Sequence, residues 1–409
     1  MTTTARPNAA PLSRRLRVAL YSHDAQGLGH TRRNLALATA ISRMSPTPDV
    51  LLFTGAPEAV AYARPPGCDI VSLPGLIKHT DGRYAARHLS TSLDDLTSLR
   101  SSVLFGALAS FAPNVLIVDK YPRGAFAELE VTLDLLTLRG TRIVLGLRDV
   151  LDEPGRSYDE WRMQRGPEAL DRWYDQVWVY GDPRVCDPVP ALHLPWAAAR
   201  KVVHTGYLAH GRGPSAPVPA VSRAGRRVLG LVGGGSDGAA LAESFAAAPF
   251  PSGTTGILVT GPHMPAEDRA RVEQAAQGRS DLEVKDFASD LDPWLAQATA
   301  VVTMGGYNSI CEVLARGLPT LVVPRVHPRR EQLLRAERMS ALGLLDVLHP
   351  DDASPARLGS WISEAVRRPR RVATDVDLDG LARIPDLVST LVAGQAAAEN
   401  LTEADVVAV

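Results

Sequence analysis

The chain has few cysteines, no strong excess of charge of either sign and no long apolar run. Its 409 residues include three cysteines, Cys68, Cys186 and Cys311, which are widely spaced and odd in number. This pattern fits neither a disulfide framework nor a cysteine-based metal site, and it favours a reducing compartment. The formal net charge is -1, whereas a nucleic-acid-binding surface needs a basic excess. We therefore expect no disulfide-stapled fold and no nucleic-acid partner.

The sequence also shows no segment that is expected to enter or cross a membrane. No unbroken apolar stretch is long enough to span a bilayer, and residues 1–14 lack the apolar core of a signal peptide. We expect these residues to form a disordered leader. The protein is expected to be cytoplasmic, with at most peripheral membrane contact.

Hydrophobic residues make up 45% of the chain and charged residues 22%, as in globular proteins, and the length predicts two domains.

Two distant segments begin alike, with a strand, a glycine-containing loop and a helix. Residues 17–22 predict the first strand, and the loop after it ends in GLGH. Residues 227–232 predict the second strand, which leads into GGGSDG and an alanine-rich helix. Short apolar runs alternate with helical patterns through both halves, which predicts two doubly wound parallel sheets of the α/β class. The other predicted strands are residues 115–119, 142–147, 176–180, 256–260, 282–287, 299–304 and 320–324.

The domain boundaries follow from composition. Residues 211–225 (GRGPSAPVPAVSRAG) are rich in proline, glycine and serine and predict a linker. An N-terminal α/β domain would then occupy residues 15–210 and a second α/β domain residues 226–384. Residues 385–409 would form a C-terminal helix and tail that can pack back on the first domain. Since ligands bind beyond the carboxyl ends of parallel strands, the two domains should face each other across a cleft.

The segment VVTMGGYNSICEVLARGLPTLVVP predicts an anion site. A buried strand leads into Gly305 and Gly306, where the backbone can approach a ligand closely. The next helix should start on Asn308 or Ser309, where free N–H groups and the helix dipole attract a diphosphate. Glu312, one turn along, is placed to accept hydrogen bonds from a ribose diol. The alternative is an ordinary strand-helix unit in which Glu312 is only solvated.

The glycine loop GGGSDG also fits two short motifs of other enzyme classes. It matches the GxGxxG fingerprint of dinucleotide-binding folds, but the next predicted strand ends in VTGP, with no carboxylate to hold a ribose. It also matches the GxSxG nucleophile motif of α/β hydrolases through Ser236, but nothing marks a partner acid or histidine. A small hydroxyl residue in a phosphate-binding loop explains the same letters, so we favour neither alternative.

The order and spacing of several motifs resemble one enzyme family. A glycine loop near the N-terminus, HTGYLA before the linker, LGLVGGGSDGA after it, VKDF, the MGGYNSICE segment and a downstream EQ resemble the family 28 glycosyltransferases of GT-B fold. The segments YSHD, GLGH and VDKYPRG resemble more closely still a group of uncharacterised bacterial proteins described as predicted glycosyltransferases. The resemblance covers residues 17 to about 348. It implies two facing Rossmann-like domains and a sugar transferred from a nucleoside diphosphate, expected to be UDP.

In this family the second domain holds the sugar nucleotide. The resemblance implies that glycine loops and the helix start hold the diphosphate, a strand end reads the base, and an acidic-amide pair binds sugar hydroxyls. The family has an arginine shortly after its counterpart of Gly206, where this chain has YLAH. The cation that offsets the diphosphate is therefore open, with His210 and Arg325 as candidates. The implied donor-binding residues are Gly29, Gly234, Gly235, Ser236, Phe287, Ala288, Gly305, Gly306, Asn308, Ser309, Glu312, Glu331 and Gln332.

The catalytic residues implied by the resemblance lie in the first domain. His30, at the end of the first glycine loop, resembles the catalytic histidine of inverting GT-B enzymes, and Asp119 the aspartate that orients it. Such a pair would take the proton from an acceptor hydroxyl. Packing of His30 and turn capping by Asp119 are the structural alternatives, and His23 and Asp24 could replace either role. The acceptor-side candidates are Lys78, His79, Arg83 and Arg87, which otherwise solvate a loop.

Other functions remain open at this stage. A sugar-nucleotide 2-epimerase shares the overall fold but opens with a Gly-Thr-Arg-Pro-Glu loop, which this chain lacks. A nucleotide-sugar-binding protein without enzymatic activity is the second alternative. No pair of carboxylates ends a predicted strand of the donor domain, so we expect no cofactor and no essential metal. The acceptor is expected to be a small molecule or a lipid-linked one.

Overall fold

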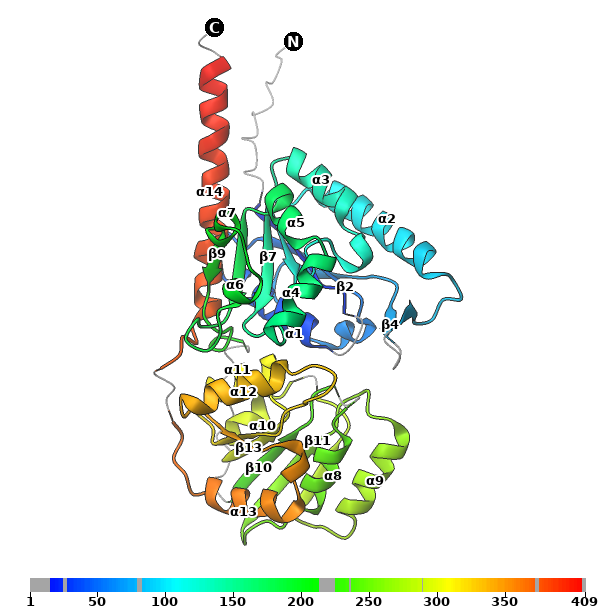
Figure 1. Cartoon of the computed structure of the whole chain (residues 1–409), viewed down its shortest axis with the longest axis vertical. Coiled ribbons are helices and arrows are strands. Elements are labelled where there is room, and N and C mark those ends of the chain that lie inside the picture. Colours follow the sequence, from blue (N-terminus) through cyan, green and yellow to red (C-terminus); the bar gives the residue numbers. More distant parts are fainter. Residues whose placement is uncertain are drawn as a thin grey trace, which may run out of the picture.

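The computed structural model describes residues 15–24, 28–78, 83–212, 225–234, 237–288, 290–371 and 375–406, with backbone alone at Lys78 and over residues 395–406. It consists of two α/β domains, one above the other in Figure 1, with the longest helix at the outer edge of the first. The expected leader and most of the expected linker lie outside the described residues. The predicted fold class, two parallel-sheet α/β domains, is confirmed.

The first domain is built on a seven-stranded parallel sheet in the order β3-β2-β1-β6-β7-β8-β9. Its central strands are buried along almost their whole length, as expected for strands covered on both faces by helices. The strands that sequence analysis did not name include the outer strands β3 and β9, whose half-exposed residues carry a weaker apolar signal. The strands are β1 (Arg17–Tyr21), β2 (Asp49–Thr54), β3 (Cys68–Ser72), β6 (Val115–Asp119), β7 (Arg142–Arg148), β8 (Gln176–Tyr180) and β9 (Val202–His204), with a separate hairpin of β4 (Leu76–Lys78) and β5 (Tyr84–Ala86).

The second domain has a six-stranded parallel sheet in the order β12-β11-β10-β13-β14-β15. In both sheets the first strand in the chain lies in the interior, so the strand order reverses beside it, and ligands of doubly wound folds bind at such a point. These strands are β10 (Arg226–Leu231), β11 (Thr254–Val259), β12 (Leu282–Lys285), β13 (Ala300–Thr303), β14 (Thr320–Val322) and β15 (Asp346–Val347).

Helices cover both sheets. In the first domain they are α1 (Gly29–Ile41), α2 (Leu93–Phe111), α3 (Glu130–Leu138), α4 (Pro154–Met163), α5 (Gly166–Trp173), α6 (Pro188–Ala191) and α7 (Trp196–Ala199), with 3₁₀ turns η1 (Pro57–Ala61) and η2 (Ala125–Ala127). In the second they are α8 (Ala239–Ala247), α9 (Ala266–Ala276), α10 (Asp292–Gln297), α11 (Tyr307–Leu314), α12 (Glu331–Ala341) and α13 (Pro355–Ala365), with η3 (Pro350–Asp352). Within the described ranges, no helix has both the length and the apolarity needed to cross a bilayer.

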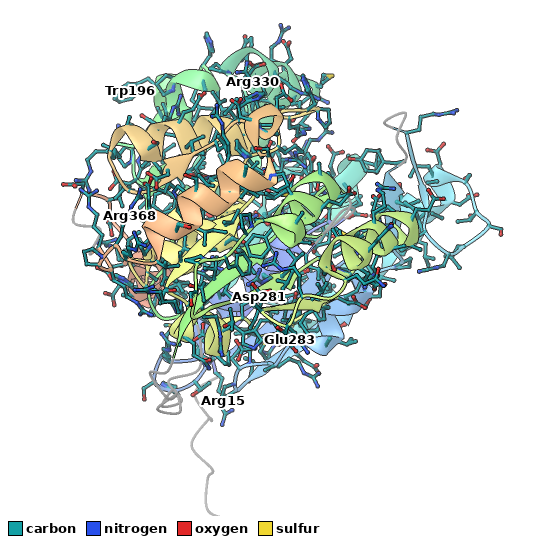
Figure 2. All side chains as sticks on the ribbon, turned by 90° about the horizontal axis from the view of Figure 1, so that it is seen from below. Arg15, Trp196, Asp281, Glu283, Arg330 and Arg368 are labelled. Carbon is teal, nitrogen blue, oxygen red and sulfur yellow. The ribbon has the colours of Figure 1, made fainter. Side chains whose placement is uncertain are left out.

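The chain crosses back to the first domain at its end. Helix α14 (Gly380–Val406) begins five residues before the expected Pro385, which it contains. It packs against α1, β6 and β7 of the first domain and runs up its side in Figure 1. Around the second domain, viewed from below, charged side chains of both signs such as Asp281, Glu283 and Arg368 reach solvent (Figure 2).

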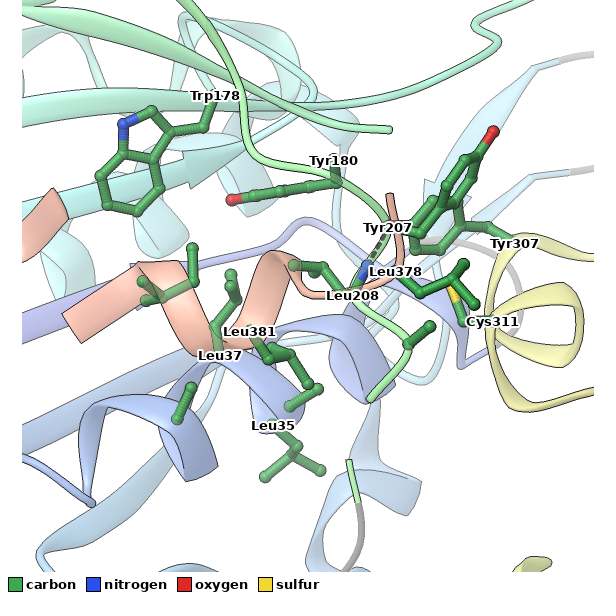
Figure 3. Packing of buried hydrophobic residues seen from close by; sticks show 14 of the residues in the cluster. Leu35, Leu37, Trp178, Tyr180, Tyr207, Leu208, Tyr307, Cys311, Leu378 and Leu381 are labelled. Carbon is green, nitrogen blue, oxygen red and sulfur yellow. Dashed lines mark hydrogen bonds between the residues drawn. The ribbon is translucent and has the colours of Figure 1, made fainter. Parts of the chain in front are cut away.

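One hydrophobic cluster joins the two domains. Leu37 of α1 and Leu381 of α14 belong to the same buried cluster as Tyr307 and Cys311 of α11 (Figure 3). The rings of Tyr207 and Tyr307, one from each side, stack with 6.0 Å between centroids. The junction therefore fixes the start of α11 against the first domain.

Candidate functional site

A cleft opens between the carboxyl ends of the two sheets. Its first-domain wall comes from the start of α1 and the end of β7, and its second-domain wall from the loops after β10, β11, β12 and β13. This is the arrangement expected from facing doubly wound sheets. The residues that line it include Gly29, His30, Arg32, Arg33, Tyr62 and Arg148 from the first domain and Gly233, Gly234, Phe287, Ala288, Gly306, Asn308, Ser309, Arg325 and Gln332 from the second.

The start of α11 has the geometry of an anion site. Gly305 has φ +77°, and a Cβ there would lie 2.5 Å from Val322 Cγ1, so only glycine fits. The helix begins at Tyr307, one residue before the expected start, and no side chain caps its first N–H groups. Gly306, Asn308 and Ser309 all face the cleft. An anion in this position would meet free N–H donors and the positive end of the helix dipole.

Asn308 also links the two walls of the cleft. Its Nδ2 donates to the carbonyl of Gly29 at 2.9 Å, and its Oδ1 accepts from Arg212 Nη1 at 2.8 Å. Gly29 thus lies at the cleft as a neighbour of the predicted donor-binding turn.

Glu312 is 7% exposed and is not among the residues that line the cleft surface. One of its oxygens, Oε1, accepts from Arg32 of α1 and lies 3.9 Å from Arg212 Nη1. The other, Oε2, is buried without a hydrogen-bond partner among the described residues. An unpaired carboxylate oxygen costs free energy, which a ribose hydroxyl would recover by donating to it. The ribose role of Glu312 stays a prediction.

The acidic-amide pair lies at the start of α12. Gln332 faces the cleft and accepts from the backbone N–H of Arg325 at 2.9 Å. Glu331 is 3% exposed and ion-paired with Arg325. Burial alone would raise the pKa of Glu331, but Arg148 and Arg325 hold it below its usual value, so the group is ionised at neutral pH.

The residues predicted to contact the nucleobase lie on the same wall. Phe287 and Ala288 line the cleft, and the Phe287 ring meets Tyr62 of the first domain edge-on at 6.2 Å. Gly234 lines it as well. Gly235 and Ser236 lie outside the described residues, so their contacts stay predictions.

His30 and Asp119 meet although 89 residues separate them. His30 Nδ1 lies 2.7 Å from Asp119 Oδ2. Arg33, one turn along α1, donates to Asp119 Oδ1 at 2.6 Å, and its Nη2 also lies 2.9 Å from His30 Nδ1. The Asp119 carboxylate can only accept from Nδ1, whereas the Arg33 guanidinium can only donate to it. The shorter contact is the one to Asp119, which favours the proton on Nδ1 and Nε2 as the basic nitrogen.

Burial and charge set the protonation of this group. Burial would raise the pKa of Asp119, but Arg33 and His30 outweigh it and keep the carboxylate ionised. Burial lowers the pKa of His30, Asp119 raises it and the Arg33 charge lowers it, with a net value below the usual one. At neutral pH the His30 ring is therefore mostly uncharged, as a general base requires.

The neighbouring loop residues have different surroundings. Asp24 is fully buried and accepts hydrogen bonds from Thr54 Oγ1 at 2.7 Å and from the Thr31 N–H, in the first turn of α1, at 3.2 Å. Its observed contacts are those of a helix cap. The His23 ring stands edge-on to His30, with 4.9 Å between centroids.

The acceptor-side candidates of the β4-β5 hairpin are less well placed. Arg87 Nη1 lies 3.4 Å from Glu58 Oε1 and is not among the residues lining the cleft. Arg83 is exposed. The Lys78 side chain and His79 lie outside the described residues, so their acceptor-side role stays a prediction.

Several arginines at the cleft were missed by sequence analysis. Arg32, Arg33 and Arg148 line it, and Arg212 reaches Asn308. The RRN letters after GLGH could have signalled the first two, because they fall on the first turns of the helix that follows the loop. Arg325, one of the two candidates for the missing cation, lines the cleft. The other, His210, is half-exposed and bonds Asp379 instead.

A buried ion pair fixes the two walls relative to each other. Arg335 of α12 donates to both carboxylate oxygens of Asp149, which follows β7, and Tyr207 donates to the same carboxylate at 2.7 Å. Arg335 Nη1 also reaches the carbonyl of Gly305 at 3.3 Å. The ion pair therefore ties the glycine turn at α11 to the end of the first-domain sheet.

The family model of the glycosyltransferase family 28 C-terminal domain matches residues 230–390. That span begins in β10 and contains the α11 turn, Glu312, Glu331 and Gln332. The second domain is therefore similar to the C-terminal domain of family 28 glycosyltransferases. The matched span does not include residues 15–210 of the first domain. The similarity of that domain to known proteins comes from the sequence relatives and solved structures that follow.

The curated relatives of the chain include N-acetylglucosamine transferases. Over 181 residues the chain is 29% identical to the UDP-N-acetylglucosamine--N-acetylmuramyl-(pentapeptide) pyrophosphoryl-undecaprenol N-acetylglucosamine transferase of Brucella suis biovar 1, covering 41% of this chain and 48% of that protein. Over 277 residues it is 26% identical to the transferase of the same name from Klebsiella pneumoniae, covering 58% and 76%. With the Brucella proteins, the chain spans about half the length of the relatives it matches.

Solved structures extend the likeness to both domains. The glycosyltransferase VinC in complex with dTDP superimposes with a TM-score of 0.60 at 18% identity, over 93% of this chain and 99% of that one. A candidate UDP-N-acetylglucosamine 2-epimerase from Listeria monocytogenes gives 0.56 at 12% identity, over 90% and 93%. At such identities the likeness shows the fold, so the chain has the GT-B fold around its family 28-like domain.

Proposed function

We propose that the protein is an inverting glycosyltransferase that moves a sugar from a nucleoside-diphosphate sugar, with UDP as the nucleotide, to a hydroxyl acceptor. The observation that carries the proposal is the position of His30. It faces the glycine turn at Gly306 across one cleft and has Nε2 as its basic nitrogen. The family 28-like domain on the opposite wall supports a sugar nucleotide as the donor.

In the proposed reaction, His30 Nε2 takes the proton of the acceptor hydroxyl. The oxygen forms a bond to the anomeric carbon as the bond from that carbon to the diphosphate oxygen breaks, and the nucleoside diphosphate leaves with the electron pair. A single displacement of this kind inverts the configuration of the sugar carbon. Asp119 stabilises the imidazolium that forms, as the carboxylate does in other histidine-based sites.

The leaving diphosphate gains negative charge, which the second-domain wall of the cleft and the arginines can offset. The N–H groups at the start of α11 supply donors, and Arg32, Arg148 and Arg325 supply positive charge at the same cleft. This set replaces the single arginine that the family carries after its counterpart of Gly206.

The His30→Ala variant tests the base. We expect UDP affinity, measured by calorimetry, to stay within about twofold, because Asp119 and the α11 turn remain. Turnover should fall at least about 100-fold, the low end for general-base catalysis. His210→Ala is the matched control, since His210 is half-exposed and outside the cleft, and it should leave both quantities unchanged. Lost UDP affinity with unchanged turnover at saturation would refute the assignment.

A donor assay without acceptor separates the candidate functions. We incubate the protein with UDP-N-acetylglucosamine, because the relatives are named for this donor, and analyse the products by mass spectrometry and NMR. Free sugar and UDP support the transferase. A C2 epimer would identify the epimerase, whose fold this chain shares, and bound donor that stays unchanged also after hydroxyl acceptors are added would identify a binding protein. Mass spectrometry of any copurifying nucleotide fixes the donor.

The relatives and structural neighbours suggest two acceptor classes. The relatives are named for a pyrophosphoryl-undecaprenol acceptor, which is lipid-linked. A solved neighbour, a rhamnosyltransferase at 16% identity and TM-score 0.52, is described in complex with the aglycone of spinosyn. The first domain carries the residues that choose between them.

A further inference from the structure

A second cavity lies in the first domain next to His30. It has a volume of about 340 Å³, within reach of the range for small-molecule sites. Its walls are the β4-β5 hairpin, the segment after β6 and the end of α4. His23, Leu76, Tyr84, Tyr121, Phe126 and Met163 are among the residues that line it. The cleft described above does not share these residues.

The cavity reaches the catalytic histidine through aromatic rings. The Tyr121 ring stands edge-on to His23 with 4.4 Å between centroids, and the His23 ring stands edge-on to His30 at 4.9 Å. A molecule seated against Tyr121 and His23 therefore needs to extend past one ring to bring a hydroxyl to His30. The His23 ring is thus the one ring between the cavity and His30.

The walls are apolar and nearly uncharged. Among the described residues that line the cavity, Arg123 is the one with a permanent charge, and it is ion-paired with Glu130. Apart from His23 and Gln164, the remaining wall is aromatic, aliphatic or backbone. The Lys120 ammonium lies 4.7 Å from the centroid of the Tyr121 ring, and burial lowers its pKa to about 7. A diphosphate or a carboxylate would therefore lose its hydration here for a lysine that is only partly protonated at neutral pH, whereas an uncharged ring gains apolar contact.

Two exposed apolar side chains stand at this cavity. Phe126 is 46% exposed and Met163 76% exposed. The Phe126 ring meets Tyr84 edge-on at 5.2 Å. Phe126 and the next residue, Ala127, have φ of 51° and 64°, a left-handed conformation that is strained for non-glycine residues and is concentrated at ligand sites. The fold therefore holds an aromatic ring at the cavity despite backbone strain.

His23 is the polar residue of the cavity that contacts the His30 ring. It is 7% exposed, and its Nδ1 is buried without a hydrogen-bond partner among the described residues. Buried polar atoms of native proteins are normally hydrogen-bonded. A ligand with a hydroxyl or carbonyl beside its ring can supply the partner that the protein does not.

We infer that this cavity is the acceptor site and that the acceptor is a small uncharged alcohol or phenol with an aromatic or fused-ring body. The ring packs against Tyr121 and Phe126, His23 hydrogen-bonds a polar group of the ligand, and the reacting hydroxyl projects to His30. The inference rests on the proposed function, because it assigns the acceptor of that same reaction. It disfavours a lipid-linked diphosphate in this cavity.

The test uses 4-methylumbelliferone, a neutral two-ring phenol, titrated calorimetrically into the full chain in the presence of UDP. We expect saturable binding that Phe126→Ala weakens at least about tenfold, because an aromatic contact face is lost. Met163→Glu, which places a charge beside the cavity, should weaken it by a similar factor. Leu138→Ala is the matched control, since Leu138 is an 86% exposed apolar residue of the same domain that does not line the cavity.

UDP affinity is measured in every variant and should stay within about twofold, which shows that the variants are folded and the donor site intact. No binding of 4-methylumbelliferone, or equal binding by Phe126→Ala and the control, would overturn the inference while the donor results leave the proposed function standing. Binding of undecaprenyl phosphate in detergent micelles that is lost in Phe126→Ala would overturn it in favour of a lipid. Conversely, phenol binding without any sugar transfer would refute the proposed function, while the cavity would still be a binding site for such phenols.

Discussion

The buried pair of Asp149 and Arg335 is the contact whose loss should most weaken the arrangement of the two domains. Both side chains are at most 1% exposed, and Arg335 Nη2 lies 2.8 Å from Asp149 Oδ1. Removing one partner of a buried ion pair costs about 3 to 5 kcal/mol, because the other charge stays buried without compensation. Native proteins are stable by only about 5 to 15 kcal/mol. We therefore expect Asp149→Ala to lower the free energy of unfolding by about 3 to 5 kcal/mol.

The assay is urea unfolding followed by tryptophan fluorescence, with two comparison variants. Arg330→Ala removes an interdomain pair with Glu153 whose members are 45% and 46% exposed, and such pairs contribute about 0 to 1 kcal/mol. The double variant Asp149→Leu, Arg335→Met replaces the buried charges by apolar groups, so its free energy of unfolding should fall less than that of either single variant. A cost for Asp149→Ala no larger than that of Arg330→Ala, or a double variant as unstable as the singles, would refute the reasoning.

The same pair predicts a pH dependence. Burial would raise the pKa of Asp149, but the charge of Arg335 and the hydrogen bonds from Arg335 and Tyr207 hold it below its usual value. A carboxyl with a depressed folded-state pKa stabilises the protein above its unfolded pKa of about 3.9, and that contribution is lost as the pH falls through the folded value. The stability difference between the wild type and the double variant should therefore stay constant from about pH 5 to 8 and shrink below about pH 4.

Three further outcomes are expected at the cleft. Glu312→Ala should weaken UDP binding about 10- to 100-fold, as loss of a hydrogen bond to a charged group does. The same variant should bind 2′,3′-dideoxy-UDP, which lacks the ribose hydroxyls, as tightly as the wild type does. An equal loss of affinity for both nucleotides would show that Glu312 does not bind the ribose. Arg33→Gln should raise the pKa of His30, because a neighbouring positive charge is lost; NMR titration of the His30 ring measures this, the acidic limb of turnover should move to higher pH, and an unchanged or lower pKa would contradict it. EDTA should leave turnover unchanged, since arginines and N–H groups offset the diphosphate charge; abolished turnover that Mg²⁺ restores would show an essential metal.

Local patterns were sufficient for the fold class and for much of the second wall of the cleft. The strand-turn-helix letters around Gly305 predicted the anion-binding turn, because a positive φ and a helix start are properties of a few adjacent residues. Most of the strands buried on both faces were found for the same reason, since continuous apolar runs carry a strong signal. Strand β2 was not named, although its Val50, Leu52 and Phe53 are buried. The outer strands β3 and β9 were not named, because half-exposed residues lack that signal.

Contacts between distant segments were decided by the tertiary structure. The family resemblance suggested His30 and Asp119, but the third member, Arg33, follows from the helical turn that carries it back over Asp119. The pairing of Glu312 with Arg32 joins residues 280 positions apart, and no local pattern encodes such a distance. The aromatic cavity beside His23 is assembled from a hairpin, a strained turn and a helix end, so it exists only once these segments are packed together. The sequence by itself determined the fold class and the glycine turn with its helix start, because both depend on neighbouring residues. Packing decided how the charges of the cleft are paired and what faces His30.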